Sequence, residues 1–239
     1  MAGLSGAILA AGLGQRLRGG VGGLPKPLVE LRGQPLLLRQ IDLLMRVGAS
    51  PIHVIINPET SCLMHKLVVC PPDGVQLLVA DTANSMESLL RLGDHIPSGL
   101  FVLMTVDAVM FPGDLRNFVT HATKIVADGE SKLAGVLGVV EWQGDVNPLF
   151  AEIDEGGIIT AFRRSQPPMV TAGVYLLSTA VFNHAAEARM RRLDAMRRFF
   201  GLVLERGTRF AALRVPKAID IDNPADLRAA EAMLARESE

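Results

Sequence analysis

The chain has 239 residues, of which 49% are hydrophobic, so it is long enough to bury one substantial core. Its 24 basic residues nearly balance its 25 acidic ones. The chain therefore lacks the strong positive charge that is typical of proteins that bind nucleic acid or anionic membranes. No apolar run approaches the ~18 residues of a membrane span, and the apolar stretch 4–13 has no basic residue before it, as a secretory signal would. We therefore expect one cytoplasmic domain without membrane or nucleic-acid partners.

The first half of the chain alternates short apolar runs with helical patterns. Residues 4–10 predict a buried strand, because the run is short and bounded by glycines. A helix is expected from Gln34, with Pro35 in the first helical position, to about Gly48. Strands separated by helices predict parallel βαβ units. The other elements expected in this half are strands at 52–56, 75–79 and 100–106 and a helix at 85–92.

From about Lys132 the pattern changes to strand-like segments that follow one another closely. Residues 154–157 predict a hairpin turn, so this half is expected to be partly antiparallel. A helix is expected at 179–205 with Gly207 as its stop, and another begins at Pro224. The two halves together predict an α/β fold, a three-layer Rossmann-like structure with a mixed, mostly parallel sheet. The strands expected in this half are 133–141, 147–153, 158–163, 170–177 and 210–215.

A glycine-rich and basic loop follows the first predicted strand. Its glycines allow backbone N–H groups to surround phosphate oxygens, and Arg16 and Lys26 add positive charge. The Walker pattern does not fit, because Lys26 is followed by a proline. The Rossmann fingerprint does not fit either, because Leu17 stands where its third glycine would be. The loop therefore predicts a polyphosphate site of another type.

Two segments resemble the signature of the nucleotidyltransferase family, which includes the sugar-phosphate nucleotidyltransferases and the MobA-like proteins. They read LAAGLGQRL at 9–17 and PKPLVELRGQPLL at 25–37, in the family's order and spacing. The resemblance implies that Arg16 and Lys26 are catalytic residues that contact the triphosphate of a nucleotide. It also implies that the strand end and the loop hold the base and phosphates, through Leu9, Ala10, Ala11, Gly12 and Gly14.

Three aspartates are candidate metal ligands. Asp107 follows the apolar run 100–106, and ligands bind at the carboxyl ends of strands in open α/β sheets. An aspartate there is often only a turn residue, but the family has its first magnesium-binding aspartate at the matching place, usually after a glycine rather than Val106. The segment 218–227 resembles the family's DxDTPEDL element, which implies that Asp220 and Asp222 join Asp107 around Mg²⁺. The alternative is that Asp222 or Asn223 caps the last helix, so Asp220 is the better candidate.

Further substrate contacts are implied by weaker resemblances. Asn84 and Ser85 lie where the family recognises base and ribose, although they could equally cap the following helix. The sequence TAGVY at 171–175 resembles the strand that lines the acceptor pocket. This implies acceptor contacts for Gly173 and for Asn147 on the neighbouring hairpin. The adjacent Arg163 and Arg164 fall where acceptor-phosphate contacts are expected, or form a solvated edge.

The resemblance implies an enzyme that joins a nucleoside triphosphate to a phosphate monoester, a sugar 1-phosphate in the first instance, and releases pyrophosphate. Residues 1–131 would form the nucleotide-binding half of a single domain, and residues 132–239 the acceptor-binding half with the C-terminal helix. The alternatives are a cytidylyltransferase acting on phosphocholine or inositol phosphate, a molybdenum-cofactor nucleotidyltransferase, and a non-catalytic nucleotide-sensing subunit. The sensing subunit is disfavoured because all the basic and acidic site residues are present.

Other features predict no further chemistry. Cys62 and Cys70 lack the spacing of a zinc site or a disulfide framework, which indicates idle or buried thiols in a reducing cytosol. The sequence has neither an HExxH nor a GxSxG motif, so hydrolytic chemistry has no support. A basic run at 189–198 predicts a solvated helical face, or a contact in a homodimer.

Overall fold

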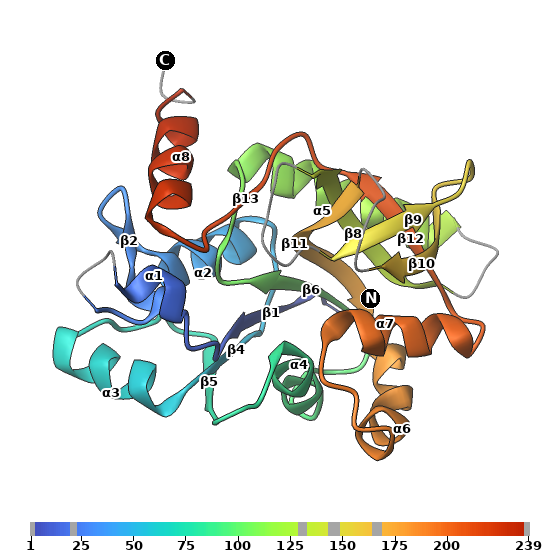
Figure 1. The fold of residues 1–239 in the computed structure, drawn as a ribbon, viewed down its shortest axis with the longest axis horizontal. Coiled ribbons are helices and arrows are strands. Elements are labelled where there is room, and N and C mark those ends of the chain that lie inside the picture. The colour runs from blue at the N-terminus through green and yellow to red at the C-terminus, as the bar shows by residue number, and fades with distance from the viewer. Residues whose placement is uncertain (1–2, 20–22, 129–132, 143–148, 164–168, 237–239) are drawn as a thin grey trace.

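A computed structural model describes residues 3–19, 23–128, 133–142, 149–163 and 169–236 of the chain. Within these residues, nine strands form one sheet in the order β5-β4-β1-β6-β11-β8-β12-β10-β9 (Figure 1). The expected mixed α/β fold with a mostly parallel first half and a partly antiparallel second half is confirmed. The strands are β1 (Ser5–Ala10), β4 (Ile52–Ile56), β5 (Val75–Val79), β6 (Leu100–Thr105), β8 (Leu133–Glu141), β9 (Phe150–Ile153), β10 (Ile158–Arg163), β11 (Met169–Ser178) and β12 (Arg209–Arg214).

Strand β1 lies inside the sheet, parallel to both β4 and β6. All six of its residues are buried, which explains why its sequence is a continuous apolar run rather than an alternating one. Strand β11 is antiparallel to both β6 and β8, and its register with β8 shifts between Thr171 and Tyr175. Gly173 lies in this irregular stretch with φ +69°, a conformation that favours glycine.

Helices cover both faces of the sheet, which gives the three layers. Figure 1 shows α4 and α7 on one side and α2 and α5 on the other. The two hydrophobic clusters follow this division, since one includes the buried side chains of α2 and α5 and the other those of α4 and α7. The helices are α1 (Gln15–Arg18), α2 (Leu36–Arg46), α3 (Pro58–Leu67), α4 (Ser85–Gly93), α5 (Pro112–Asp128), α6 (Ala185–Met190), α7 (Met196–Glu205) and α8 (Pro224–Ala235), with 3-10 turns η1 (Lys26–Leu28) and η2 (Thr179–His184).

The single helix expected at 179–205 is wrong. The segment is divided into η2, α6 and α7, and the chain turns between the last two at Arg192, which has φ +51°. The turn lets α7 lie across the sheet and bury Phe200 against Phe210 of β12, with ring centroids 5.1 Å apart. The expected stop is confirmed, because Gly207 lies just beyond α7 with φ +78°. Tertiary packing therefore divided a segment whose local pattern favoured one helix.

Two short antiparallel strand pairings were not expected from the sequence. Pro35 does not occupy the first helical position of α2 but precedes the helix, because β3 (Gln34–Pro35) pairs with β2 (Glu30–Leu31). Near the site, β13 (Ile219–Asp220) pairs with β7 (Ala108–Val109). The second pairing joins the C-terminal segment to the end of β6. Within the described part of the chain, no helix has the length and apolar character needed to cross a membrane.

Candidate active site

The candidate site lies at the carboxyl ends of β1 and β6, where two cavities adjoin. The first cavity, of about 560 Å³, extends over the glycine-rich loop, and the second, of about 280 Å³, extends toward β11 and α7. Leu9 at the end of β1 and Asp107 just after β6 line both of them. This placement agrees with the rule that ligands of α/β sheets bind beyond the carboxyl ends of the strands.

The first cavity brings together most residues implied for the nucleotide. The loop lines one wall, and residues 81–85 with Ser88 line another. Ala10 does not line either cavity; it is buried in β1. The side chain of Asn84 accepts a hydrogen bond from the backbone N–H of Glu87 and so caps α4, while Asn84 still lines the cavity. The implied residues that line the first cavity are Leu9, Ala11, Gly12, Gly14, Arg16, Lys26, Asn84, Ser85 and Asp107.

Gly14 is the point at which the loop turns into α1. It has φ +57°, and its carbonyl accepts from the backbone N–H groups of Leu17 and Arg18. A Cβ at this position would lie 2.8 Å from the Cβ of Lys26, which is closer than atoms in contact can be. Gly14 therefore permits both the turn and the close approach of Lys26.

Gly14→Ala is expected to destabilise the protein by about 1 to 2 kcal/mol through the left-handed backbone alone, and to weaken nucleoside triphosphate binding by displacing Lys26. Gly12→Ala is the matched control, because a Cβ on Gly12 would meet nothing within 4 Å. Thermal unfolding and calorimetric titration with a nucleoside triphosphate measure the two effects. Equal melting temperatures and affinities for the two variants would contradict this reading of the loop.

Lys26 is the centre of an ion-pair network. Its Nζ donates to Asp107 Oδ2 at 2.7 Å and to Asp222 Oδ1 at 3.0 Å, and Arg16 pairs with the other oxygen of Asp222 at 3.1 Å. Only 8% of Lys26 is exposed. Burial alone would lower the pKa of the Lys26 ammonium, but the charge of Asp107, with smaller contributions from Asp222 and Asp220, raises it above the ordinary value. Lys26 therefore keeps its positive charge beside Asp107, which lines both cavities.

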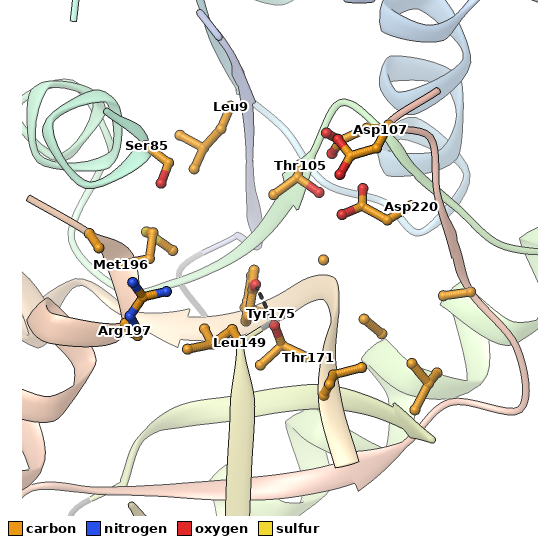
Figure 2. Close-up of a pocket in the computed structure, with 17 residues that line it drawn as sticks. Leu9, Ser85, Thr105, Asp107, Leu149, Thr171, Tyr175, Met196, Arg197 and Asp220 are labelled. Atoms are coloured by element: carbon orange, nitrogen blue, oxygen red, sulfur yellow. Dashed lines mark hydrogen bonds between the residues drawn. The ribbon is translucent and has the colours of Figure 1, made fainter. Parts of the chain in front are cut away.

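Asp107 and Asp220 form a carboxylate pair, and their side chains face each other in Figure 2. Burial alone would raise the pKa of Asp107, but the charge of Lys26 and hydrogen bonds from Lys26, Thr105 and Asp220 lower it. Asp220 is open to the cavity but enclosed by its walls. This enclosure and the charge of Asp107 raise the pKa of Asp220 well above its usual range, against the smaller opposing effect of Lys26. The pKa values of the two carboxyl groups are thus shifted in opposite directions, as expected of neighbouring acids of which only one lies against the lysine.

Asp220→Asn is expected to raise the melting temperature at neutral pH in metal-free buffer. A raised pKa in the folded state means that folded Asp220 keeps its proton while the unfolded chain has lost it. Stability therefore falls as pH rises from the ordinary aspartate value of 3.8 through the raised pKa. The asparagine removes this penalty, which solvent screening limits to under about 1 kcal/mol, or roughly 2 to 4 °C. The difference between variant and wild type should vanish below about pH 4, and a difference independent of pH would contradict the pairing.

Asp220 and Asp222, which precede α8, contact different partners. Asp222 contacts Lys26 and Arg16, whereas Asp220 faces Asp107. Asn223, not Asp222, caps α8, and Asp226 completes a capping box by accepting from the backbone N–H groups of Asp222 and Asn223. The cap therefore fixes the backbone on which both aspartates stand.

The two carboxylates that converge are suited to Mg²⁺, which takes hard oxygen ligands and commonly binds through one or two carboxylates with waters and phosphates. Lys26 compensates the charge of Asp107, whereas Asp220 has no ion pair among the described residues. In the described part of the chain, no three His, Cys, Asp or Glu side chains group as metal ligands. The donor set thus fits a cation held by a carboxylate pair and by substrate oxygens.

The second cavity is walled by β11 and by the start of α7. Gly173 lines it, and a Cβ there would lie 2.6 Å from Thr105 Oγ1 and 2.5 Å from the Cβ of Ala108. The Tyr175 hydroxyl donates to Thr171 Oγ1 at 3.2 Å, and burial raises the pKa of Tyr175 to about 12, so the hydroxyl stays protonated (Figure 2). Asn147 and Arg164 lie outside the described residues. Arg163 pairs with Glu152 and lines neither of the two cavities.

Sequence reasoning did not identify Gln40, which positions the turn that carries Asp107. Gln40 is fully buried, and its Nε2 donates to the carbonyls of Val106 at 3.2 Å and Ala108 at 2.6 Å. A polar side chain within the apolar stripe of α2 was the available signal. Thr105 and Arg197 were likewise not assigned to the site, because only the fold brings them to the second cavity. Thr171 and Tyr175 belong to the TAGVY strand that the resemblance had placed there.

Comparison with known proteins agrees with this geometry. The model of the MobA-like NTP transferase domain family matches residues 6–193. The chain belongs to this family. It is a nucleotidyltransferase, and the resemblance found in its glycine-rich loop is confirmed.

Individual relatives extend over nearly the whole chain. The UTP–glucose-1-phosphate uridylyltransferase AglF of Haloferax volcanii is 27% identical, over 97% of this chain and 96% of that protein. The inositol-1-phosphate CTP transferase of T. maritima has a TM-score of 0.75 at 21% identity, and covers 98% of this chain and 96% of its own. The CTP:phosphocholine cytidylyltransferase LicC of Streptococcus pneumoniae has a TM-score of 0.74 at 19% identity, over 97% and 99%. At these identities the two structures indicate a shared fold.

Proposed function

We propose that this nucleotidyltransferase transfers a nucleotidyl group from a nucleoside triphosphate to a sugar 1-phosphate and releases pyrophosphate. The observation that carries the proposal is the meeting of two cavities at Lys26 and the Asp107–Asp220 pair. A nucleotide on the glycine-rich loop and an acceptor beside Gly173 would bring two phosphates together there. The sugar acceptor is supported by the name of the relative that aligns over nearly the whole chain.

The reaction needs positioning more than proton transfer. A phosphate monoester has its second pKa near 6, so at neutral pH its oxygen is already mostly ionised and needs no general base. This oxygen would attack the α-phosphorus in line, the bond from that phosphorus to the bridging oxygen would break, and pyrophosphate would leave with the bond electrons. The barrier is repulsion among the phosphates, which positive charge at the junction of the cavities lowers.

The proposed residue roles follow from position and charge. Lys26 and Arg16 would leave their aspartate partners in part to hold the triphosphate and offset the charge that develops on pyrophosphate. Asp107 and Asp220 would hold Mg²⁺, which when bound would draw together and neutralise the reacting phosphates. Asp222 would serve as the counter-charge that keeps the two basic side chains in place before substrate binds, and as a metal ligand only if it rotates.

Mg²⁺ is expected to raise the melting temperature of the wild-type protein and to have little effect on Asp220→Asn. Binding to the folded state alone stabilises by an amount set by the free metal concentration. Thermal unfolding after chelation, followed by titration with Mg²⁺, measures this without any assay of activity. Glu30→Gln is a suitable control, because Glu30 is exposed on β2. An equal shift in wild type and Asp220→Asn would contradict the metal assignment.

The experiment that tests the function is a substrate matrix. The protein is incubated with Mg²⁺ and each of CTP, UTP, GTP, ATP and dTTP against hexose 1-phosphates, phosphocholine and inositol phosphate, and pyrophosphate release is followed. Release with a hexose 1-phosphate supports the proposal and identifies the base. Release only with an alcohol phosphate would replace the acceptor class, and no release with any pair would contradict the transfer reaction.

We further propose that the chain acts as one cytoplasmic domain. The main sheet includes strands from both halves, and the site uses residues from each. Cys62 and Cys70 are exposed free thiols, which suits a reducing compartment. A homodimer remains a prediction, and sedimentation of the purified protein tests it.

A further inference from the structure

One basic side chain in the second cavity has no counter-charge. Arg197, in the first turn of α7, lines the cavity, and among the described residues that do so it is the only Lys, Arg or His. It has no ion-pair or hydrogen-bond partner within the described part of the chain. Its neighbours differ, because Arg191 pairs with Glu187 and Glu205, and Arg198 pairs with Asp194. Arg197 thus lines the cavity without an ion-pair partner among the described residues.

The position of Arg197 separates it from the reacting centre. Figure 2 shows its side chain beside Met196 and Leu149, across the cavity from Asp107 and Asp220. Tyr175 and Thr171 lie between. A phosphate that reacts beside Lys26 and the carboxylate pair would therefore leave Arg197 at the opposite end of the acceptor.

The chemistry at this end favours an anion. A guanidinium is always charged, is half-buried here, and binds a carboxylate or phosphate through paired N–H donors. The first turn of α7 adds to this preference, because Ala195 at its start gives no side-chain cap and lines the same cavity. The flanking walls include Leu149, Val170 and Met196, which offer no competing charge.

We propose that the acceptor carries a second anionic group, a carboxylate or a second phosphate, at the end remote from its reacting phosphate, and that Arg197 binds this group. The inference rests on the proposed function and specifies which charged groups the acceptor of that reaction carries. In this cavity of about 280 Å³, Arg197 offers positive charge at one end, and Mg²⁺ held by the carboxylate pair would offer it at the other, so an acceptor with an anionic group at each end fits. Arg197 is thus a specificity residue that recognises the substrate and takes no part in the chemical step.

The test uses acceptors that differ only at the remote end. Glucose 1-phosphate, glucuronic acid 1-phosphate and glucose 1,6-bisphosphate share the reacting phosphate and carry a neutral, a carboxylate and a phosphate group at the sixth carbon. kcat/KM is measured by pyrophosphate release with the best nucleotide, for wild type, Arg197→Met and Arg197→Lys. Arg198→Met is the matched control, since Arg198 is the next residue on α7, is exposed and pairs with Asp194. Thermal unfolding of each variant verifies folding.

Wild type is expected to prefer one of the anionic acceptors by about 10- to 100-fold, the range for a hydrogen-bonded charged group. Arg197→Met should remove the preference with little change for glucose 1-phosphate, Arg197→Lys should keep part of it, and Arg198→Met should behave as wild type. A wild type that uses neutral and anionic acceptors equally, or an Arg197→Met variant that loses activity equally on all three, overturns the inference and leaves the proposed function intact. Absence of pyrophosphate release with every acceptor overturns the proposed function itself, and the inference with it.

Discussion

Asp107→Asn is expected to lower kcat by about 10³-fold or more while the protein remains folded, because it removes one carboxylate of the Asp107–Asp220 pair and the charge nearest to Lys26. The asparagine preserves the size of the side chain, so the geometry of the turn should persist. Pyrophosphate release under saturating substrates measures the effect. Asp73→Asn is the control, because Asp73 is exposed and lines neither candidate cavity.

The folding of this variant is expected to survive for an electrostatic reason. Breaking a buried ion pair commonly costs about 3 to 5 kcal/mol, because it leaves one charge without compensation. Here Lys26 keeps Asp222 at 3.0 Å, and Asp220 loses the neighbouring charge that raised its pKa. The cost to the free energy of unfolding should therefore be smaller. A folded Asp107→Asn protein with the wild-type rate would contradict the assignment of the site.

Lys26→Met is expected to lower kcat/KM by roughly 30- to 10³-fold, equivalent to about 2 to 4 kcal/mol of transition-state stabilisation. Methionine keeps much of the length and packing of the side chain and removes only the charge. Steady-state kinetics over a range of nucleotide concentrations separate weaker binding from slower turnover. Lys124→Met is the control, since Lys124 is exposed on α5. An unchanged kcat/KM for the nucleotide would contradict the role of Lys26.

The pH profile gives an independent check on Lys26. The aspartates around it raise its pKa above the ordinary 10.5, so it should not lose its proton in the working range. No fall in rate due to this lysine is therefore expected up to about pH 10. Lys26→Arg should recover only part of the activity, because a planar guanidinium cannot occupy the position of Nζ between two carboxylates.

Local sequence was sufficient to identify the parallel strands and the glycine-rich loop that lines the first cavity. The run at 4–10 matches β1 to within one residue, and the strands expected at 52–56 and 75–79 match β4 and β5. Strands β1 and β4 are buried on both faces, and β5 pairs with β4. A short apolar run is the sequence pattern expected for strands in this position. The glycines and basic residues of the loop were identifiable for a similar reason, because their conformational freedom and charge are properties of the residues themselves.

The tertiary structure decided how distant residues meet. Asp107 and Asp220 are 113 positions apart, and only the pairing of β7 with β13 places their carboxylates together. The same packing directed Asp222 toward Lys26 and Arg16, although the resemblance implied that it would join Asp107 and Asp220 around Mg²⁺. The division of the expected helix at 179–205 placed Arg197 in the second cavity.

Sequence by itself thus determined the fold class, the family and the basic residues of the glycine-rich loop, because apolar periodicity, glycine and fixed charge act within a few residues. Only the tertiary structure decided which carboxylates form a pair, which of them lies against the lysine, and which arginine is left unpaired in the second cavity. The physical reason is that pKa values, ion pairs and cavity walls depend on atoms brought together across the chain, and their free energies are set by burial and distance.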